Sequence, residues 1–425
     1  MYEQFQFGNQ LTNIIEDVEA QIADVHRRVD QNVENNQYRL MQAFRHHQVS
    51  DFHFTPSTGY GYDDAGRDTL EAIYAEVFGA EAALVRPQII SGTHAIATAL
   101  FGILRPQDEL LYMTGAPYDT LEEVVGVRGN GNGSLNDYDI SYRAIPLKED
   151  GTIDYPQVKA AIHDRTKMIG IQRSKGYANR PSFTIEEIKE MIQYVKAIKP
   201  DVIVFVDNCY GEFVETKEPC HVGADIIAGS LIKNPGGGIV KTGGYLVGKQ
   251  ELVEMSSYRL AAPGIGSEGG ASLYSLLEMY QGLFLAPHVV GQALKGAVFT
   301  AAFLEKLGMD TTPSWKEKRT DLIQAVQFGE KDRMVAFCQA IQAASPINSH
   351  VTPQPSPMPG YEDHVIMAAG TFIQGASIEL TADGPLRSPY VAYVQGGLTY
   401  AHVKLAVISA IDHLLQTKDI RLEVT

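Results

Sequence analysis

The chain of 425 residues is 44% hydrophobic and 20% charged, which is ordinary for a globular protein and long enough for two domains. Its formal net charge of −16, from 51 acidic and 35 basic side chains, excludes the broad basic face that a large nucleic-acid interface needs. Only three cysteines occur, and none stands at a Cys-x-x-Cys spacing. A disulfide framework is therefore excluded, and a reducing, cytoplasmic compartment is favoured.

The sequence predicts neither a targeting segment nor a membrane-spanning helix. The start, Met1-Tyr2-Glu3-Gln4, lacks a basic region followed by an apolar run, so no signal peptide is expected. No run of about 18 consecutive apolar residues occurs anywhere in the chain, so no spanning helix is expected either.

The first fifty residues are predicted to form a helical arm. Residues 11–44 are amphipathic and contain few glycine or proline breakers. The composition changes from Asp51, because glycines and aromatic residues crowd positions 58–64. A strongly helical run over residues 67–78 follows.

Short apolar strands then alternate with helices, which is typical of a parallel sheet covered on both faces. The expected strands are residues 82–87, 108–114, 168–172 and 202–206, and the expected helices are residues 93–104 and 185–198. Ligands of open α/β sheets gather at the carboxyl ends of the strands. We therefore expect an α/β fold whose site lies just past these strands.

The last third of the chain is predicted to be a smaller α+β domain. A helix over residues 272–307 leads into it, and the strands 326–328 and 376–381, a proline-rich loop at 350–360 and a helix at 402–416 follow. The expected division is an arm at 1–50, a large domain at 51–285 and a smaller domain at 286–425. The glycines of residues 128–134 do not stand between a strand and a helix, so that segment is a loop and not a dinucleotide-binding motif.

Asp207 directly follows the most apolar predicted strand. A buried carboxylate is costly unless it is paired, and a protonated pyridine nitrogen is a suitable partner. A carboxylate that caps the next turn is an equally good interpretation of Asp207 alone.

Lys233 follows another short apolar strand and precedes Gly236-Gly237-Gly238. Its amine can form an imine with an aldehyde, and glycines after it let the backbone approach a flat ring closely. Ser230, three residues earlier, is placed to donate to a phosphate. A surface lysine beside a turn is the alternative, and the position of Asp207 one strand earlier favours the chemical interpretation.

A phosphate also needs a cradle, and Ser91-Gly92-Thr93-His94 stands where a loop becomes a helix. Backbone N–H groups and the dipole at a helix start favour a dianion, although a plain helix cap has the same sequence. Tyr118 follows a strand end and is placed to stack on a pyridine ring. Arg387, in a proline-bounded loop, is suited to bind a carboxylate through paired hydrogen bonds, or is a surface arginine.

The histidines offer no obvious metal site. His46, His47 and His53 form the only local cluster among twelve histidines. The polar end of the N-terminal helix explains them more simply than a metal does, because the usual ligand spacing is missing. We therefore predict no metal.

Together these motifs resemble the fold-type-I enzymes dependent on pyridoxal 5′-phosphate (PLP), and within them the methionine γ-lyase family, which includes the bacterial aluminium-resistance proteins. The resemblance runs from Tyr60 to the C-terminal helix. Its most specific parts are residues 59–64, 91–95, 206–208 and 230–238.

The resemblance implies a role for each of these residues. Lys233 would anchor PLP and act in catalysis together with Tyr118, which stacks on the ring, and Asp207 would face the pyridine nitrogen. The remaining implied contacts are Gly92, Thr93, Ser230 and Tyr60 at the cofactor, and Arg387 at the substrate carboxylate. In the family a Tyr-x-Arg of the neighbouring subunit reaches the phosphate, but here the stretch ends in Tyr62, and Arg67 comes later.

The resemblance also implies a homodimer or homotetramer with shared active sites. The expected activity is carbon–sulfur lyase action, by β- or γ-elimination, on a cystathionine-, methionine- or cysteine-like amino acid. The alternatives are another PLP reaction, such as transamination or retro-aldol cleavage, and a PLP-holding stress-related protein with little turnover.

Overall fold

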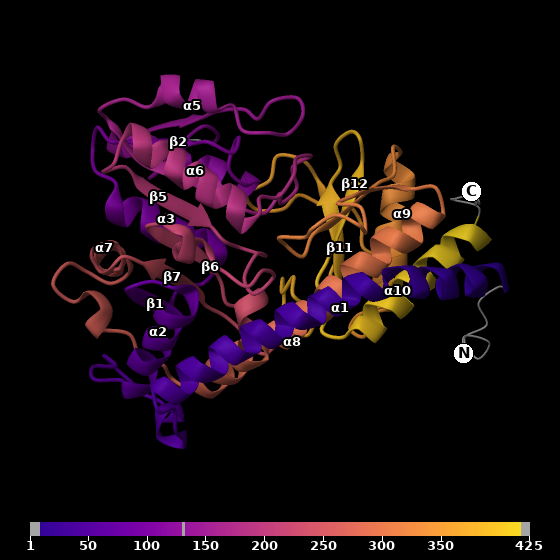
Figure 1. The fold of residues 1–425 in the computed structure, drawn as a ribbon, viewed down its shortest axis with the longest axis horizontal. Helices are drawn as coiled ribbons and strands as arrows, with labels where there is room; N and C mark the ends of the chain where they lie inside the picture. The colour runs from indigo at the N-terminus through magenta and orange to yellow at the C-terminus, as the bar shows by residue number, and fades with distance from the viewer. Residues whose placement is uncertain (1–8, 130–131, 418–425) are drawn as a thin grey trace. The chain divides into compact units, whose positions relative to one another are not determined.

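The computed structural model describes residues 9–129 and 132–417, which fold into two compact units (Figure 1). One unit is Asn36–Leu285, and the other combines the described residues up to 35 with those from 286 onward. The chain passes from one unit to the other within α1 (Asn9–His46) and within α8 (Leu276–Lys306). The division into an arm and two domains therefore stays a prediction. The residues Met1–Gln4 and part of the glycine-rich segment 128–134 lie outside the described residues.

The Asn36–Leu285 unit is built on a seven-stranded sheet of order β1-β7-β6-β5-β4-β2-β3. β7 is antiparallel to both of its neighbours, and the other pairs are parallel. Mostly apolar, buried residues make the inner strands, as expected for a sheet covered on both faces, whereas the edge strand at residues 141–144 is only partly buried. The strands are β1 (Ala82–Arg86), β2 (Glu109–Tyr112), β3 (Ser141–Ala144), β4 (Thr166–Gln172), β5 (Ile203–Asp207), β6 (Ile226–Ser230) and β7 (Gly244–Gly248).

Helices cover this sheet. The helix α3 packs on β6 and β7, and small residues such as Ala95 and Ala99 let it lie close to the sheet in one apolar core. The start of α6 is fixed by a capping box between Thr184 and Glu187. The helices of this unit are α2 (Ala65–Phe78), α3 (Gly92–Ile103), α4 (Glu122–Val125), α5 (Tyr155–Ala161), α6 (Ile185–Ile198) and α7 (Gln250–Leu260). Short 3₁₀ helices are η2 (Asp51–Phe54), η3 (Asp119–Leu121), η4 (Asn136–Tyr138), η5 (Pro219–Val222), η6 (Asn234–Gly236) and η7 (Gly266–Glu268).

The other unit contains a five-stranded antiparallel sheet of order β10-β11-β12-β9-β8. Its strands are β8 (Asp310–Thr312), β9 (Gln324–Gln327), β10 (Val365–Ala368), β11 (Thr381–Pro385) and β12 (Val391–Gln395), and its helices are α9 (Lys331–Ala343) and α10 (Tyr400–Gln416). Apolar residues from the first turns of α1, such as Leu11 and Ile15, join the core of this unit with Phe303 and Ile411.

The structure confirms the α/β fold with a large, mostly parallel sheet and a smaller sheet. One predicted strand is wrong, because residues 376–381 form turns and β11 begins only at Thr381. The carboxylate of Glu379 accepts hydrogen bonds from the backbone N–H groups of Phe372 and Ile373, at 2.8 and 2.9 Å. The apolar side chains of this segment are buried in a turn held by Glu379, which an apolar run cannot distinguish from a strand.

Among the described residues, α8 is the one helix long and apolar enough to cross a membrane by length and composition alone. However, 72% of its most apolar window is buried inside the protein. Burial of this kind is expected of a long core helix, which passes the same test.

Candidate functional site

The predicted chemistry converges at the carboxyl ends of β5 and β6. These strands are parallel neighbours with Asp207 opposite Ala228, so Asp207 and Ser230 end at the same edge of the sheet. The first residue of α3, Gly92, lies against them. A Cβ added to Gly92 would stand 3.2 Å from the Cys209 sulfur and 3.4 Å from the Ser230 Cβ. Three predicted segments therefore meet here.

Lys233 follows β6 and lies in the same place. Its Nζ stands 3.9 Å from the centroid of the Tyr210 ring. Tyr210 adopts a φ of 70°, a conformation that residues other than glycine adopt rarely and that is concentrated at functional sites. This left-handed turn after β5 presents the aromatic ring to the amine.

The surroundings favour the charged form of Lys233. Burial alone would lower the pKa of this amine, but nearby acidic groups raise the pKa above its ordinary value. These groups are Cys209, Tyr210, Asp207 and Glu212. The amine is therefore held as an ammonium ion unless a bound group changes its surroundings.

Asp207 is 6% exposed, and one of its oxygens accepts a hydrogen bond from the Cys209 N–H at 3.1 Å. Burial raises the pKa of Asp207, while the positive charges of Lys233 and Arg180 act in the opposite direction. A carboxylate removed from water in this way is stabilised by a cationic partner. A protonated pyridine nitrogen is such a partner, so Asp207 fits the predicted cofactor.

The start of α3 forms a cradle of the right chemistry for phosphate, which we call the phosphate cradle and define as Gly92, Thr93 and Ser230. Ser91 caps the helix by accepting a hydrogen bond from the His94 N–H at 3.0 Å. Because Gly92 has no side chain, the backbone at the start of α3 can approach the end of β6 closely. The dipole and free N–H groups at a helix start favour an anion there.

The segment that carries Tyr118 contacts the phosphate cradle through Thr120. The hydroxyl of Thr120, two residues later, lies 2.9 Å from the hydroxyl of Thr93. The Tyr118 ring is half-buried and stands 5.7 Å from the ring of Tyr177, tilted by 48°. Gly176 is needed for this approach, because a Cβ there would stand 2.7 Å from the Tyr118 ring.

Two of the predicted residues are not part of this cluster. Tyr60 is 78% exposed and stacks on Tyr62, with ring centroids 5.4 Å apart. Arg387 belongs to the other unit, where its guanidinium is partly exposed and lies 3.4 Å from a carboxylate oxygen of Asp363. Arg67, the arginine that follows the Tyr60 stretch, is buried and donates to the backbone carbonyls of Gly61 and Gly270.

The sequence did not single out Glu212, which is fully buried. One of its oxygens accepts a hydrogen bond from the Tyr245 hydroxyl at 2.7 Å, and the other, Oε2, has no hydrogen-bond partner among the described residues. Burial raises the pKa of Glu212 to about 8, with the charge of Glu218 adding to the rise and that of Lys233 opposing it. Burial therefore favours the neutral, protonated form of Glu212.

Glu212 lies on the opposite face of β6 from the phosphate cradle. A Cβ added to Gly229 would meet the Tyr245 hydroxyl and a Glu212 oxygen, at 2.6 and 2.7 Å. Neighbouring residues of a strand point to opposite faces, so Ser230 points to the face where α3 begins at Gly92. The only sequence signal for Glu212 was an acidic residue shortly after a strand end.

Comparison with known proteins assigns this arrangement to a family. A family model described as methionine gamma-lyase matches residues 11–415. A solved structure from Listeria monocytogenes, described as a candidate cystathionine beta-lyase involved in aluminium resistance, is 67% identical with a TM-score of 0.92. The match covers 94% of this chain and 99% of that one. A carbon–sulfur lyase involved in aluminium resistance from Clostridium novyi is 46% identical with a TM-score of 0.93, over 97% of this chain and 98% of that one.

A more distant structure shares the fold and carries the cofactor. It is a candidate O-acetylhomoserine (thiol)-lyase from Campylobacter jejuni, with a pyridoxyl phosphate group on a lysine. Its identity is 15% and its TM-score 0.54, over 83% of this chain and 88% of that one, so it shows the fold alone.

Proposed function

Because this chain belongs to the methionine γ-lyase family of PLP-dependent carbon–sulfur lyases, we propose that it eliminates a thiol from a sulfur amino acid, with Lys233 as the anchor of PLP. The convergence of three groups carries this proposal. The amine of Lys233, the buried carboxylate of Asp207 and the phosphate cradle all meet at one edge of the sheet. Each group matches one part of the cofactor: its aldehyde, its ring nitrogen and its phosphate.

Bound PLP supplies an electron sink for the negative charge that forms at Cα of an amino acid. Asp207 would keep the ring nitrogen of bound PLP protonated, because a buried carboxylate is stabilised by that positive charge. The N–H groups of Gly92 and Thr93 and the hydroxyl of Ser230 would hold the phosphate. The neutral Lys233 amine would act as the base that accepts the Cα proton of the substrate, and Tyr118 would contact the ring.

We further propose that Arg387 binds the α-carboxylate of the substrate. A guanidinium offers two parallel donors to a carboxylate, and its present ion pair with Asp363 is partly exposed and therefore weak. The substrate is a cystathionine-, methionine- or cysteine-like amino acid, cleaved by β- or γ-elimination.

Two further features of the family are carried over as proposals. The exposed and stacked rings of Tyr60 and Tyr62 are suited to an interface, so we propose a homodimer or homotetramer in which Tyr60 reaches the cofactor of a neighbouring subunit. All three cysteines are free, which supports a reducing compartment and hence the cytoplasm.

The anchor is tested by borohydride reduction of the purified holoenzyme, followed by peptide mapping of the reduced adduct. We expect the adduct on Lys233, and loss of the visible cofactor absorbance and of turnover in Lys233→Ala. Lys241→Ala is the matched control, because Lys241 lies eight residues later, is 72% exposed and pairs with Glu278. Wild-type turnover in Lys233→Ala contradicts the proposal.

The reaction is tested separately, by product analysis with cystathionine, methionine and cysteine. Thiol, ammonia and a 2-oxo acid released together support the lyase. Transfer of the amino group to an added 2-oxo acid without thiol release indicates an aminotransferase. Normal cofactor binding without release of thiol from any of the three amino acids contradicts lyase activity on them.

A further inference from the structure

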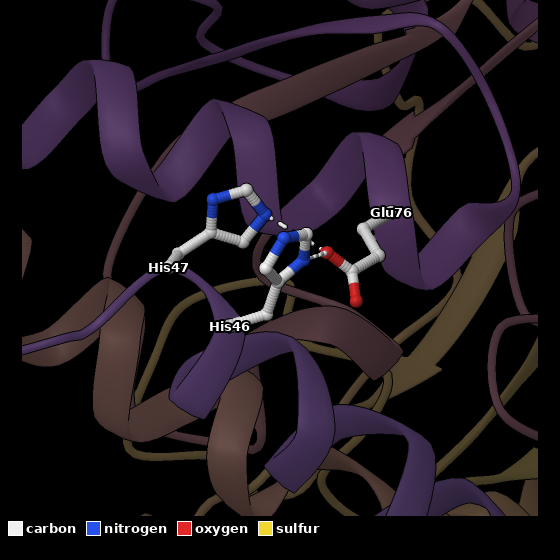
Figure 2. Close-up of side chains that lie close together, drawn as sticks. All are labelled: His46, His47 and Glu76. Carbon is white, nitrogen blue, oxygen red and sulfur yellow. Dashed lines mark hydrogen bonds and ion pairs between the residues drawn. The ribbon is translucent and has the colours of Figure 1, made fainter.

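Two neighbouring histidines and a glutamate form a cluster outside the site described above (Figure 2). His46 is the last residue of α1, His47 follows it, and Glu76 lies in the last turn of α2. All three belong to the Asn36–Leu285 unit. The sequence separates Glu76 from the histidine pair by about 30 residues, so spacing along the chain gave no sign of this group.

Ligand atoms of the three side chains lie close together around Oε2 of Glu76, which is hydrogen-bonded to Nδ1 of His46. Oε2 of Glu76 lies 2.7 Å from Nδ1 of His46 and 3.0 Å from Nε2 of His47, and all three atoms lie within 4.8 Å of one another. Figure 2 shows both imidazoles turned toward the same carboxylate oxygen. Lone pairs of two neutral imidazoles and a carboxylate repel one another at these distances unless protons or a metal cation lie between them.

The contact between His47 and Glu76 is the weaker of the two. Nε2 of His47 is shielded from solvent and lies 3.0 Å from Oε2 of Glu76, but among the described residues it has no hydrogen-bond partner. A buried polar nitrogen that is not hydrogen-bonded costs free energy, and such groups are uncommon in native proteins. A metal ion bound at this point would satisfy that nitrogen.

The backbone around the cluster also favours a cation. α1 ends at His46 and α2 ends at Phe78, so the C-terminal ends of two helices meet at these three side chains. The carbonyl end of a helix carries partial negative charge and stabilises positive charge within its last turn. The histidine pair is also held in place, because the N–H of His47 donates to the carbonyl of Ala43 at 3.0 Å.

We propose that His46, His47 and Glu76 bind a zinc ion. Two imidazole nitrogens and one carboxylate oxygen are ligands typical of zinc, and three protein ligands leave the fourth tetrahedral position to water. Zinc–ligand bonds of about 2.0–2.1 Å place tetrahedral ligands roughly 3.3 Å apart. The two contacts of Glu76 need to lengthen by only about half an ångström to reach that spacing. A hard cation such as magnesium or aluminium, which prefers oxygen ligands, is a poorer match.

The bound ion would join the end of α1 to the end of α2. The segment after His47 continues through η2 to Tyr60 and Tyr62, so the ion would fix the point from which this exposed segment starts. This role is structural, and it is independent of the chemistry at Lys233.

The test is zinc chloride titration of the tag-free holoenzyme by isothermal calorimetry, with magnesium chloride as a second cation. We expect one equivalent of zinc to bind to the wild type, and His47→Gln and Glu76→Gln each to weaken that affinity at least tenfold. His413→Gln is the matched control, because His413 is an exposed histidine in the last turn of α10 and should leave the affinity unchanged. Anomalous diffraction at the zinc edge should place the ion between His46, His47 and Glu76.

Equal zinc binding by the wild type, His47→Gln and Glu76→Gln would overturn the proposal, because the zinc would then bind elsewhere. The absence of stoichiometric binding by the wild type would overturn it as well. Lyase activity is not a readout of this experiment, so its outcome is separate from that of the proposed function.

Discussion

Glu212→Gln tests whether the buried carboxyl group on the far face of β6 is neutral in the folded protein. Glu212 is fully buried, and its pKa of about 8 in the folded protein lies above the ordinary value of 4.5. Between these two pH values the folded chain keeps a proton that the unfolded chain has lost. The stabilising contribution of this group is therefore complete below pH 4.5, and it is lost as the pH rises to 8.

The size of the effect follows from the two pKa values. The free energy of unfolding falls by about 1.4 kcal/mol for each pH unit, or about 5 kcal/mol over the whole interval. Glutamine has the same shape, still accepts the hydrogen bond from Tyr245 and stays neutral at every pH. The variant should therefore lack this slope, and its stability relative to the wild type should increase from pH 5 to pH 8.

The assay is differential scanning calorimetry of both holoenzymes across this pH range. At roughly 2 °C for each kcal/mol, the difference in Tm between variant and wild type should grow by about 8 °C. Glu218→Gln is the contrast, because Glu218 pairs with the buried guanidinium of Arg173 at 3.3 Å. Removal of one partner of a buried pair should cost about 3–5 kcal/mol at every pH. A difference in Tm between Glu212→Gln and wild type that stays constant from pH 5 to pH 8 would refute a neutral Glu212.

Three further predictions concern the cofactor and the substrate. Asp207→Asn should lower kcat/KM about 10- to 100-fold while the cofactor stays bound, because a hydrogen bond to a charged group contributes about 1.5–3 kcal/mol. Unchanged steady-state kinetics would contradict the role of Asp207 at the ring nitrogen of PLP. Gly92→Val should lower the PLP content after dialysis, measured by absorbance. The valine side chain would occupy the phosphate cradle, and its Cβ would already stand 3.2 Å from the Cys209 sulfur. Full retention of PLP would contradict phosphate binding at Gly92. Arg387→Ala should raise KM for the amino acid at least tenfold without loss of bound PLP, and an unchanged KM would place the carboxylate elsewhere.

The parts of the site that the sequence predicted are those with a local signal. Lys233 and Asp207 each follow an apolar strand, and the structure brings both strand ends to one edge of the sheet because β5 and β6 are parallel neighbours. Parallel strands joined by helices place their carboxyl ends together, so position along the chain was sufficient for these two residues. Gly92 was predictable for the same reason, since it stands where a helix begins.

The missed features depend on contacts between distant segments. Glu212 is only five residues after Asp207, but its pKa is raised by burial, against the opposing effect of the hydrogen bond from Tyr245. That burial comes from packing that no local pattern encodes. Glu76 joins His46 and His47 only because the ends of two helices meet. The same limit explains the strand wrongly predicted at residues 376–381, where a single carboxylate determines the turn.

The two faces of β6 lie against different groups: the phosphate cradle on one face and the carboxyl group of Glu212 on the other. Ser230 faces the phosphate cradle, while Gly229 faces Glu212, and only a residue without a side chain leaves room for that carboxyl group. Lys233 lies near the acidic groups of both faces, because a negative charge on Cys209, Tyr210, Asp207 or Glu212 raises the pKa of its amine. A full negative charge on Glu212 would hold the proton of this amine more tightly, whereas a neutral Glu212 does not add to the effect of the other groups. The neutral state of Glu212 therefore favours the release of the proton that Lys233 must lose before it can act as an anchor or as a base.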